Sequence, residues 1–248
     1  MKITEIIETI EEFAPLSYQE AYDNAGLLVG DRMATCTGVL LCLDVIEAVV
    51  EEAIRKKCNL IIAHHPIIFS GLKSLTGKNY IERTVLKAIK NDIAIYACHT
   101  NLDNVRLGVN NMIADKLGLI NRKILEPKKK LLKKLYTYVP EKNKDVLLNA
   151  LFEAGAGNIG NYSECSYSVC GTGTYKGNHQ SHPTIGKKNV RSTESEQNIE
   201  VIFPFHLEKK ILTALFKNHP YEEVAYEIIT LDNYYQEVGA GMIGELKT

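Results

Sequence analysis

Two adjacent histidines that interrupt an apolar stretch are the first residues in this chain that could do chemistry. In I-I-A-H-H-P-I-I-F-S-G (residues 61 to 71), His64 and His65 end one apolar run and precede a proline. His99 ends a similar run, and Asp103 follows it in H-T-N-L-D. Imidazole and carboxylate groups are standard ligands for zinc, iron, manganese and nickel. The four residues therefore predict a divalent-metal site.

The adjacency of His64 and His65 favours two ions over one. Successive side chains of an extended backbone diverge, and Pro66 biases residue 65 towards extended geometry. One ion would then be hard for both rings to reach, whereas two close ions would use both and could share Asp103 as a bridging carboxylate. A lone histidine at a strand end is more often a hydrogen-bonded core residue, but three histidines with a carboxylate favour the metal site.

Other candidate motifs are weaker. His219, in N-H-P-Y-E-E, has a metal-ligand spacing with Glu222, but the intervening proline breaks any helix that would align them, so a cap or turn is expected. His179 and His182 lie in a polar stretch and are expected to be exposed. The stretch G-T-G-T-Y-K-G (171 to 177) resembles a phosphate loop only superficially, because no helix is predicted after it.

Short apolar runs and helical periodicities alternate in the first half of the chain. Runs at 39–43, 60–63 and 93–98 predict buried strands. Helices are predicted at 3–13, after Asp44, at 80–90 and at 109–117, and Asp44 with Glu47 suggests a capping box. This order predicts an α/β domain with a parallel sheet. Ligands of such sheets bind beyond the carboxyl ends of the strands, which is where His64, His65 and His99 fall.

The second half has a different order. Lysines cluster around a proline at 121–134, which is interpreted as a solvated linker or edge segment, with an anion-binding patch as the alternative. Strands are then predicted at 135–139, 165–170, 199–205 and 224–231, with helices at 142–154 and 207–217. The β-α-β-β-α-β order is ferredoxin-like, with a glycine-rich polar insertion at 171–198. A separate small α+β domain is expected.

Composition argues against several classes of protein. The chain has 248 residues, of which 45% are hydrophobic and 24% charged, with a net charge of −1. Nucleic acid is not expected as a partner, because it is usually met with a basic excess. No apolar run approaches the roughly 18 residues of a membrane span, and the first residues lack a signal peptide's apolar core. The six cysteines form no C-x-x-C pair, which favours reduced thiols over disulfides or a zinc knuckle and predicts a cytoplasmic protein.

Three stretches resemble the Nif-three-like proteins, a widespread group of dimetal-binding proteins often labelled type 2 GTP cyclohydrolase I homologues. They are Y-D-N-A-G-L-L-V-G-D (22–31), I-I-A-H-H-P-I-I-F (61–69) and H-T-N-L-D (99–103). Four later stretches resemble the PII-like domain that is inserted in the longer bacterial members. They are L-F-E-A-G-A-G-N-I-G-N-Y (151–162), G-T-G-T-Y-K (171–176), H-P-Y-E-E-V-A-Y (219–226) and G-A-G-M-I-G-E-L (239–246).

The resemblance implies a domain plan and a set of roles. Residues 1–124 would form the N-terminal half of the metal-binding α/β domain, 125–238 the inserted ferredoxin-like, PII-like domain, and 239–248 a strand returning to the first domain. His64, His65 and Asp103 would be metal ligands for two divalent ions per complete site, with His99 beside them as a catalytic proton shuttle. The family's ring-shaped hexamers imply a homo-oligomer, here a homohexamer.

The chain departs from the family pattern in two places. Tyr22 stands where the family usually has tryptophan. Family members also continue after G-E-L into a second half of the metal domain that supplies a further histidine and glutamate, whereas this sequence stops at Thr248, which predicts a truncated chain, a weak site or a site completed by another chain. Two functions remain open. One is a metal-dependent hydrolase acting on a nucleotide or related small molecule. The other is a noncatalytic ligand-binding or assembly protein.

Overall fold

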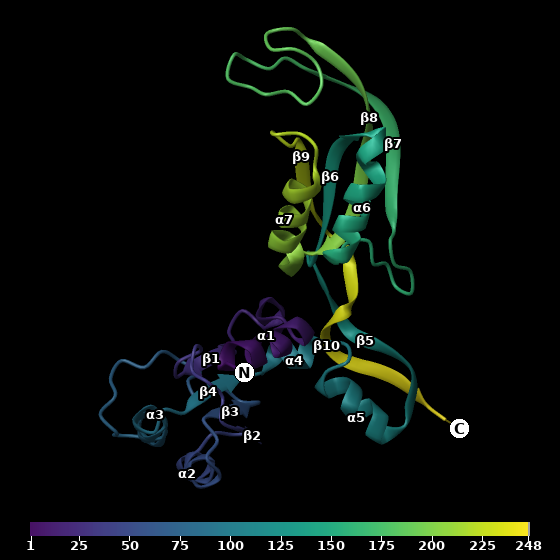
Figure 1. Ribbon diagram of the computed structural model, residues 1–248. Coiled ribbons are helices and arrows are strands. Elements are labelled where there is room, and N and C mark those ends of the chain that lie inside the picture. The colour runs from purple at the N-terminus through teal and green to yellow at the C-terminus, as the bar shows by residue number, and fades with distance from the viewer. Residues whose placement is uncertain (248) are drawn as a thin grey trace. The chain divides into compact units, whose positions relative to one another are not determined.

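The structure, a computed structural model, describes residues 1–247, which form two compact units. Unit 1 comprises Met1–Pro127 together with the chain from Gln236 onward, and unit 2 comprises Lys128–Tyr235. In Figure 1 the chain passes from unit 1 to unit 2 in the teal part of the colour scale and returns in yellow. Separate clusters of buried apolar side chains lie in the two units, so each has a core of its own.

Unit 1 contains a four-stranded sheet with the order β1-β4-β3-β2. The strands are β1 (Gly26–Val29), β2 (Val39–Cys42), β3 (Leu60–Ala63) and β4 (Ala94–Ala97). Strands β2, β3 and β4 form where predicted and are parallel, but β2 is not buried as expected, because Val39 and Leu41 are exposed. Strand β1 was not predicted and pairs antiparallel with β4. The expectation of a parallel sheet is therefore corrected to a mixed sheet, because an edge strand is free to pair in either direction.

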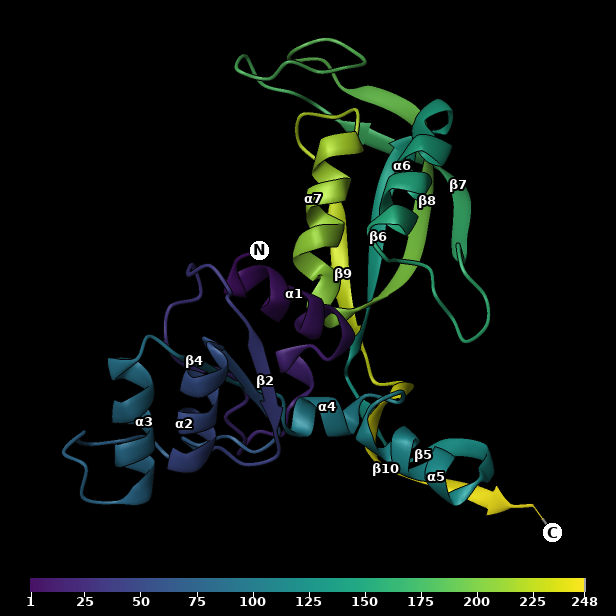
Figure 2. The same ribbon diagram turned by 60° about the horizontal axis from the view of Figure 1, so that its bottom comes forward.

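Helices cover both faces of this sheet. They are α1 (Ile3–Phe13), the 3₁₀ turn η1 (Leu16–Tyr18), α2 (Glu47–Lys56) and α3 (Tyr80–Lys90). Ile7 of α1 packs in a cluster with Leu60, whereas Val50 of α2 and Val85 of α3 pack with Ile61. Leu60 and Ile61 are neighbours in β3 and point to opposite faces, so α1 lies on one face and α2 with α3 on the other. Figure 2 shows α2 and α3 side by side.

The remaining elements of unit 1 include two that were not predicted, a helix at 100–104 and a strand at 119–129. They are α4 (Thr100–Asn104), α5 (Val109–Leu117), β5 (Leu119–Lys129) and β10 (Tyr234–Leu246), and β5 pairs with β10. Of the two interpretations of 121–134, the edge segment is thus borne out over 121–129 and the linker is not. Lysines and Pro127 lower strand propensity there, but a two-stranded ribbon has only edge strands, where both residue types are tolerated. The capping box is also absent, since α2 begins after Ile46 without a side-chain cap.

Unit 2 has the predicted ferredoxin-like order in an antiparallel sheet, β7-β8-β6-β9. Its elements are β6 (Leu132–Pro140), η2 (Glu141–Asn143), α6 (Lys144–Glu153), β7 (Ser166–Tyr175), β8 (Ser192–Pro204), η3 (Phe205–Leu207), α7 (Glu208–Asn218) and β9 (Tyr226–Leu231). The predicted insertion at 171–198 is shorter than expected. Its two ends extend β7 and β8, which leaves a loop at 176–191.

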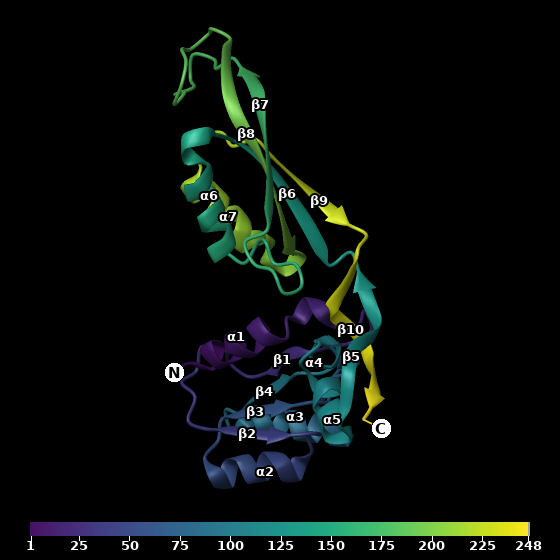
Figure 3. The ribbon, with the colours of Figure 1, turned by 90° about the vertical axis from the view of Figure 1, so that its right-hand side faces the viewer.

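The core of unit 2 lies between one face of its sheet and the helices α6 and α7. The buried strand residues are Leu135, Val139, Ile199, Val201 and Phe203. They occupy alternate positions of β6 and β8 and pack against apolar residues of both helices. Figure 3 shows the two helices on the same side of the sheet. The residues at the intervening positions of β6 and β8 therefore point to the opposite face of the sheet, which neither helix covers.

Two further expectations can be compared with the described part of the chain. None of the helices in residues 1–247 is long and apolar enough to cross a membrane. All six cysteines are free thiols, as the sequence predicted.

Candidate metal centre

Three imidazole rings meet at the carboxyl edge of the unit 1 sheet. His64 and His65 directly follow β3, and His99 follows β4 after one further residue. Because β3 and β4 are parallel and in register, with Ala63 opposite Ala97, the two strands end at the same edge. One ring nitrogen from each histidine lies within 4.8 Å of the others. The three rings that the sequence singled out are therefore brought together.

The two adjacent histidines do not diverge as an extended backbone would make them. The chain bends at His64 and His65, and the backbone N–H groups of these residues donate to the carbonyl oxygens of Cys42 and Leu43, at 3.2 and 2.9 Å. Their ring centroids are 5.0 Å apart, and each lies within 5.6 Å of the centroid of His99. For this backbone, the adjacency of the two histidines therefore does not favour two ions over one.

Each of the three rings is held through its Nδ1 atom. The partners are the carbonyl oxygen of Cys98 for His64 (2.9 Å), Asp44 Oδ1 for His65 (2.8 Å) and Asp23 Oδ1 for His99 (2.7 Å). Since all three partners are oxygen acceptors, the neutral rings carry their proton on Nδ1 and leave the Nε2 lone pair available. Acceptors of this kind fix the orientation of metal-binding histidines and raise their basicity.

Asp23 is the residue that the sequence reasoning missed. Its side chain is fully buried and accepts hydrogen bonds from His99, from the N–H and hydroxyl groups of Thr100, and from the N–H of Asn24. Burial by itself would raise the pKa of this carboxyl, but the hydrogen bonds outweigh it and hold the pKa below its usual value. Asp23 thus stays anionic beside His99. The only sequence signal was its place in the Y-D-N-A-G stretch.

Asp103, on α4, lies beside His64, although the group of ligand atoms within 4.8 Å of one another contains the three histidines and not this carboxylate. Its Oδ1 atom is 3.7 Å from Nε2 of His64, and its side chain is one-third exposed. The short helix is anchored by buried asparagines, since Asn101 donates to the carbonyl oxygen of Ala14 at 2.7 Å and Asn104 to that of Tyr18 at 2.8 Å. These bonds explain how five residues of helix can hold a carboxylate in a fixed place.

The other predicted histidine positions also have clear structural roles. His219 is the C-cap residue of α7, is buried, and its Nε2 lies 2.9 Å from the carbonyl oxygen of Tyr138, so the expected cap is confirmed. His179 and His182 are exposed, as expected. The stretch 171–177 runs from β7 into a loop and precedes no helix, which removes the phosphate-loop interpretation.

Curated relatives match most of this chain but are longer than it. A protein named "GTP cyclohydrolase 1 type 2 homolog" from Bacillus subtilis is 41% identical over 244 residues, covering 98% of this chain and 65% of the relative. One of the same name from Halalkalibacterium halodurans is 42% identical over 242 residues, covering 97% of this chain and 65% of the relative. The chain thus spans about two-thirds of the length of these relatives.

Solved structures and a family model give the same assignment. A Bacillus cereus protein described as related to NIF3 has a TM-score of 0.87 and 40% identity, with 100% of this chain and 66% of that protein covered. A Staphylococcus aureus protein has a TM-score of 0.70 and 31% identity, with 100% and 64% covered. The model of the family Duf34/NIF3 (NGG1p interacting factor 3) matches residues 1–248. This chain is therefore a member of the Duf34/NIF3 family.

Proposed function

We propose that the protein binds divalent metal ions through His64, His65, His99 and Asp103 and uses them to hydrolyse a small molecule. The observation that carries this proposal is the convergence of three imidazole rings whose Nδ1 atoms are all occupied by oxygen acceptors. Each ring already has a hydrogen-bond partner on Nδ1, and one ring nitrogen of each histidine lies within 4.8 Å of the others, which supports a shared ligand.

The donor set fits zinc, iron, manganese or nickel. Imidazole nitrogen and carboxylate oxygen suit these ions, whereas calcium and magnesium prefer oxygen ligands alone. A bound divalent ion would supply Lewis acidity, which activates water near neutral pH and polarises a substrate oxygen. The chain's own contribution is orientation: Asp23, Asp44 and the Cys98 carbonyl keep the rings in place. The resemblance to dimetal-binding proteins supports two ions per complete site, and His64, His65, His99 and Asp103 would supply part of their ligands.

His99 has two possible roles, and we propose that it is the third imidazole ligand. The sequence predicted a proton shuttle, which requires a histidine that is free to exchange a proton. The bond from Nδ1 to the buried Asp23 suits either role, but His99 also offers a ligand atom within 4.8 Å of those of His64 and His65, which supports a shared ion. In a His99→Ala variant we expect the metal content to fall. If His99→Ala kept its full metal content but lost activity, His99 would be assigned to proton transfer and not to metal binding.

The first test is metal content per chain in protein purified without chelator. We expect a stoichiometric transition metal in the unchanged protein and a large loss in His65→Ala. His179→Ala is a matched control, because it removes an exposed histidine of unit 2. Equal metal content in all three proteins would contradict the proposed centre.

The substrate is proposed from the names of the relatives. Two of them are called GTP cyclohydrolase 1 type 2 homologues, so GTP and related nucleotides are the first candidates. Hydrolysis should be assayed with the metal-loaded protein and should disappear in His65→Ala but persist in His179→Ala. If the hydrolytic activity survives His65→Ala unchanged, that activity does not depend on this centre.

We further propose that the protein is a cytoplasmic homo-oligomer, a hexamer as in the family it resembles, in which residues 125–238 act as an inserted PII-like domain. Its β-α-β-β-α-β order and antiparallel sheet support that domain type. Exposed apolar side chains of unit 1, including Leu41 and Leu43, support the association of copies. Native mass measurement tests the oligomer, and a monomer at micromolar concentration would contradict it.

A noncatalytic ligand-binding protein is the second candidate. The observation in its favour is a large cavity in unit 2, made by residues that take no part in the histidine centre. Metal-loaded protein without hydrolytic activity, but with a ligand response in unit 2, would favour this alternative.

A further inference from the structure

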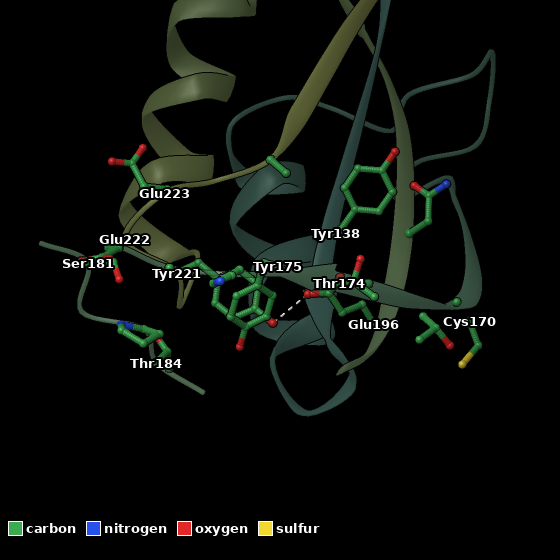
Figure 4. Close-up of a pocket in the computed structure, with 18 of the residues that line it drawn as sticks. Tyr138, Cys170, Thr174, Tyr175, Ser181, Thr184, Glu196, Tyr221, Glu222 and Glu223 are labelled. Carbon is green, nitrogen blue, oxygen red and sulfur yellow. Dashed lines mark hydrogen bonds between the residues drawn. The ribbon is translucent and has the colours of Figure 1, made fainter. Parts of the chain in front are cut away.

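Unit 2 contains a cavity of about 680 Å³ that is formed by its sheet and two loops. The loops are 176–191, between β7 and β8, and 219–225, between α7 and β9. Small-molecule sites in proteins usually measure about 300–1,000 Å³. Figure 4 shows the side chains of both loops and of the strands around this space.

The helix-free face of the sheet forms one wall of the cavity. Asn198 of β8 stands in register between Tyr138 of β6 and Val169 of β7, and Glu196 stands opposite Gly171. These residues alternate with core residues of the same strands, so they point away from α6 and α7. The wall is therefore polar and partly aromatic, because Tyr138, Asn198 and Glu196 lie on this face of the sheet.

The two loops are bonded to each other at the rim. The N–H of His182 donates to Glu222 Oε1 at 2.6 Å, and the hydroxyl of Thr184 donates to the carbonyl oxygen of Pro220 at 2.8 Å. Glu222, Thr184 and the wall residues all line the same space. These hydrogen bonds therefore hold the two loops together at the rim of the cavity.

The charge around the cavity is negative. Its charged lining residues are Glu196, Glu222, Glu223 and Lys176, which gives three carboxylates against one ammonium group. Glu196 is the most enclosed of the carboxylates, because its side chain lies over Gly173, where an added Cβ would be 2.0 Å from Glu196 Oε2. A phosphate-bearing ligand would be repelled by this set, whereas a cation would be attracted.

Tyrosine rings provide surfaces that suit the body of a cation. The ring centroids of Tyr175 and Tyr221 are 6.4 Å apart, and Figure 4 shows both rings beside Glu196. The hydroxyl of Tyr221 donates to Glu196 Oε1 at 2.7 Å. Burial, followed by this bond to a carboxylate, raises the pKa of Tyr221, so its ring stays neutral. Neutral tyrosine rings attract ammonium and guanidinium groups through their faces.

An unsatisfied acceptor lies in the same wall. Among the described residues, the Oδ1 atom of Asn198 is buried and has no hydrogen-bond partner. Buried polar atoms are nearly always paired, so an orphan acceptor in a cavity wall indicates a missing donor. Asn198 is itself one of the residues that line the cavity. The partner that satisfies it must carry an N–H or O–H group.

We propose that this cavity binds a small organic cation with N–H donors, an alkylammonium or guanidinium compound. Its charged head pairs with Glu196 and donates to Asn198, and its apolar body lies against Tyr175 and Tyr221. This site goes beyond the metal-dependent function proposed above and does not depend on it, because all its residues belong to unit 2.

The test is isothermal titration of the full chain with agmatine, which carries both an ammonium and a guanidinium group. We expect saturable binding of one agmatine per chain, and binding that is weaker by about tenfold or more in Glu196→Gln, since a charge-assisted hydrogen bond is lost. Glu153→Gln is the matched control, because it removes an equal charge from an exposed position on α6. Equal weakening in both variants would mean nonspecific charge attraction and would overturn the proposal.

Asn198→Leu gives a second, independent readout. Removing an unpaired buried oxygen should raise the thermal stability of unit 2, and removing the acceptor should weaken agmatine binding. A more stable variant that binds agmatine unchanged would overturn the role of Asn198. ATP serves as the anionic probe, and saturable ATP binding without agmatine binding would show that the site takes phosphate. The same titration in His65→Ala should be unaffected, which separates this test from that of the metal centre.

Discussion

The histidine centre of unit 1 and the cavity of unit 2 are built in opposite ways. In the centre, three rings are fixed by acceptors from neighbouring segments, and each acceptor serves one ring. In the cavity, the side chains come from paired strands and from loops that bond to each other, and one acceptor is left unpaired. The comparison teaches that the chain itself fixes the orientation of the groups in the first site, whereas the second keeps an unpaired acceptor that the proposed cation would bond.

The largest expected effect tests whether the two sites are independent. Phe203→Ala removes a fully buried ring from the core of unit 2 and should destabilise that unit by about 3–5 kcal/mol. Hydrogen exchange measured by mass spectrometry should show faster exchange in β6 and β8, with unchanged protection in β3 and β4. The metal content should also stay the same. Loss of protection in β3 would show that the two cores are coupled.

A smaller effect tests whether the centre depends on its acceptors. Asp23→Asn keeps the shape of the side chain but removes the anion that holds His99, and loss of such a partner typically costs 10–100-fold in metal affinity. Competition with a chromogenic chelator measures this affinity. Asp145→Asn is the control, because that carboxylate is exposed and lies in unit 2. An unchanged metal affinity in Asp23→Asn would mean that metal binding does not depend on the hydrogen bond between His99 and the Asp23 carboxylate.

Two neighbouring glycines of β7 sharpen the account of the cavity. A Cβ at Gly173 would collide with Glu196, whereas a Cβ at Gly171 meets nothing within 4 Å. In Gly173→Ala the Glu196 side chain must leave its rotamer, at a cost of about 0.5–1.5 kcal/mol, or roughly 2- to 12-fold in Kd for agmatine. Gly171→Ala also changes the cavity wall but needs no movement of Glu196, so its Kd for agmatine should change less than that of Gly173→Ala. Equal Kd values for both variants would indicate that the position of Glu196 is unimportant.

A pH-dependent effect concerns the loop that follows the histidine pair. Glu82 is buried and accepts hydrogen bonds from the N–H groups of Thr76 and Lys78, which lower its pKa to about 2. A carboxyl whose pKa is lowered by folding stabilises the protein at pH values above its unfolded-state pKa, near 4.5. This contribution is lost as the pH falls towards the folded-state pKa of about 2.

Denaturant unfolding of unit 1 should therefore show a decrease in stability between pH 4.5 and 2 that is reduced in Glu82→Gln. Glu12→Gln, at an exposed position, should keep the full decrease. An identical pH dependence in all three proteins would contradict the assignment to Glu82.

The histidine centre could be predicted because its signals are local. His64, His65 and His99 directly follow apolar runs, and parallel strands bring such ends to one edge. The acceptors were harder to predict, since Asp23 reaches His99 across 76 positions of sequence and Asp44 was interpreted as a helix cap. Sequence periodicity does not report which distant carboxylate meets a given ring.

The cavity of unit 2 had no such signal. The stretch 171–198 was interpreted as a polar insertion, although its ends extend β7 and β8 and form the wall of the cavity. Its chemistry depends on strand register, which places Asn198 beside Tyr138 and Glu196 beside Gly171. Alternation of polar and apolar residues predicts a face of a strand, but the partner at each position depends on the whole sheet.

The pairing of β5 with β10 has a consequence for the order of folding. These strands flank unit 2, so their pairing must close a loop that contains residues 128–235, at an entropic cost of about 4 kcal/mol. Unit 2 removes much of this cost when it folds, because Leu132 of β6 pairs with Leu231 of β9 and brings the two ends together. The folding of unit 2 thus brings β5 and β10 close together, and the β5–β10 ribbon is expected to form after unit 2 has folded.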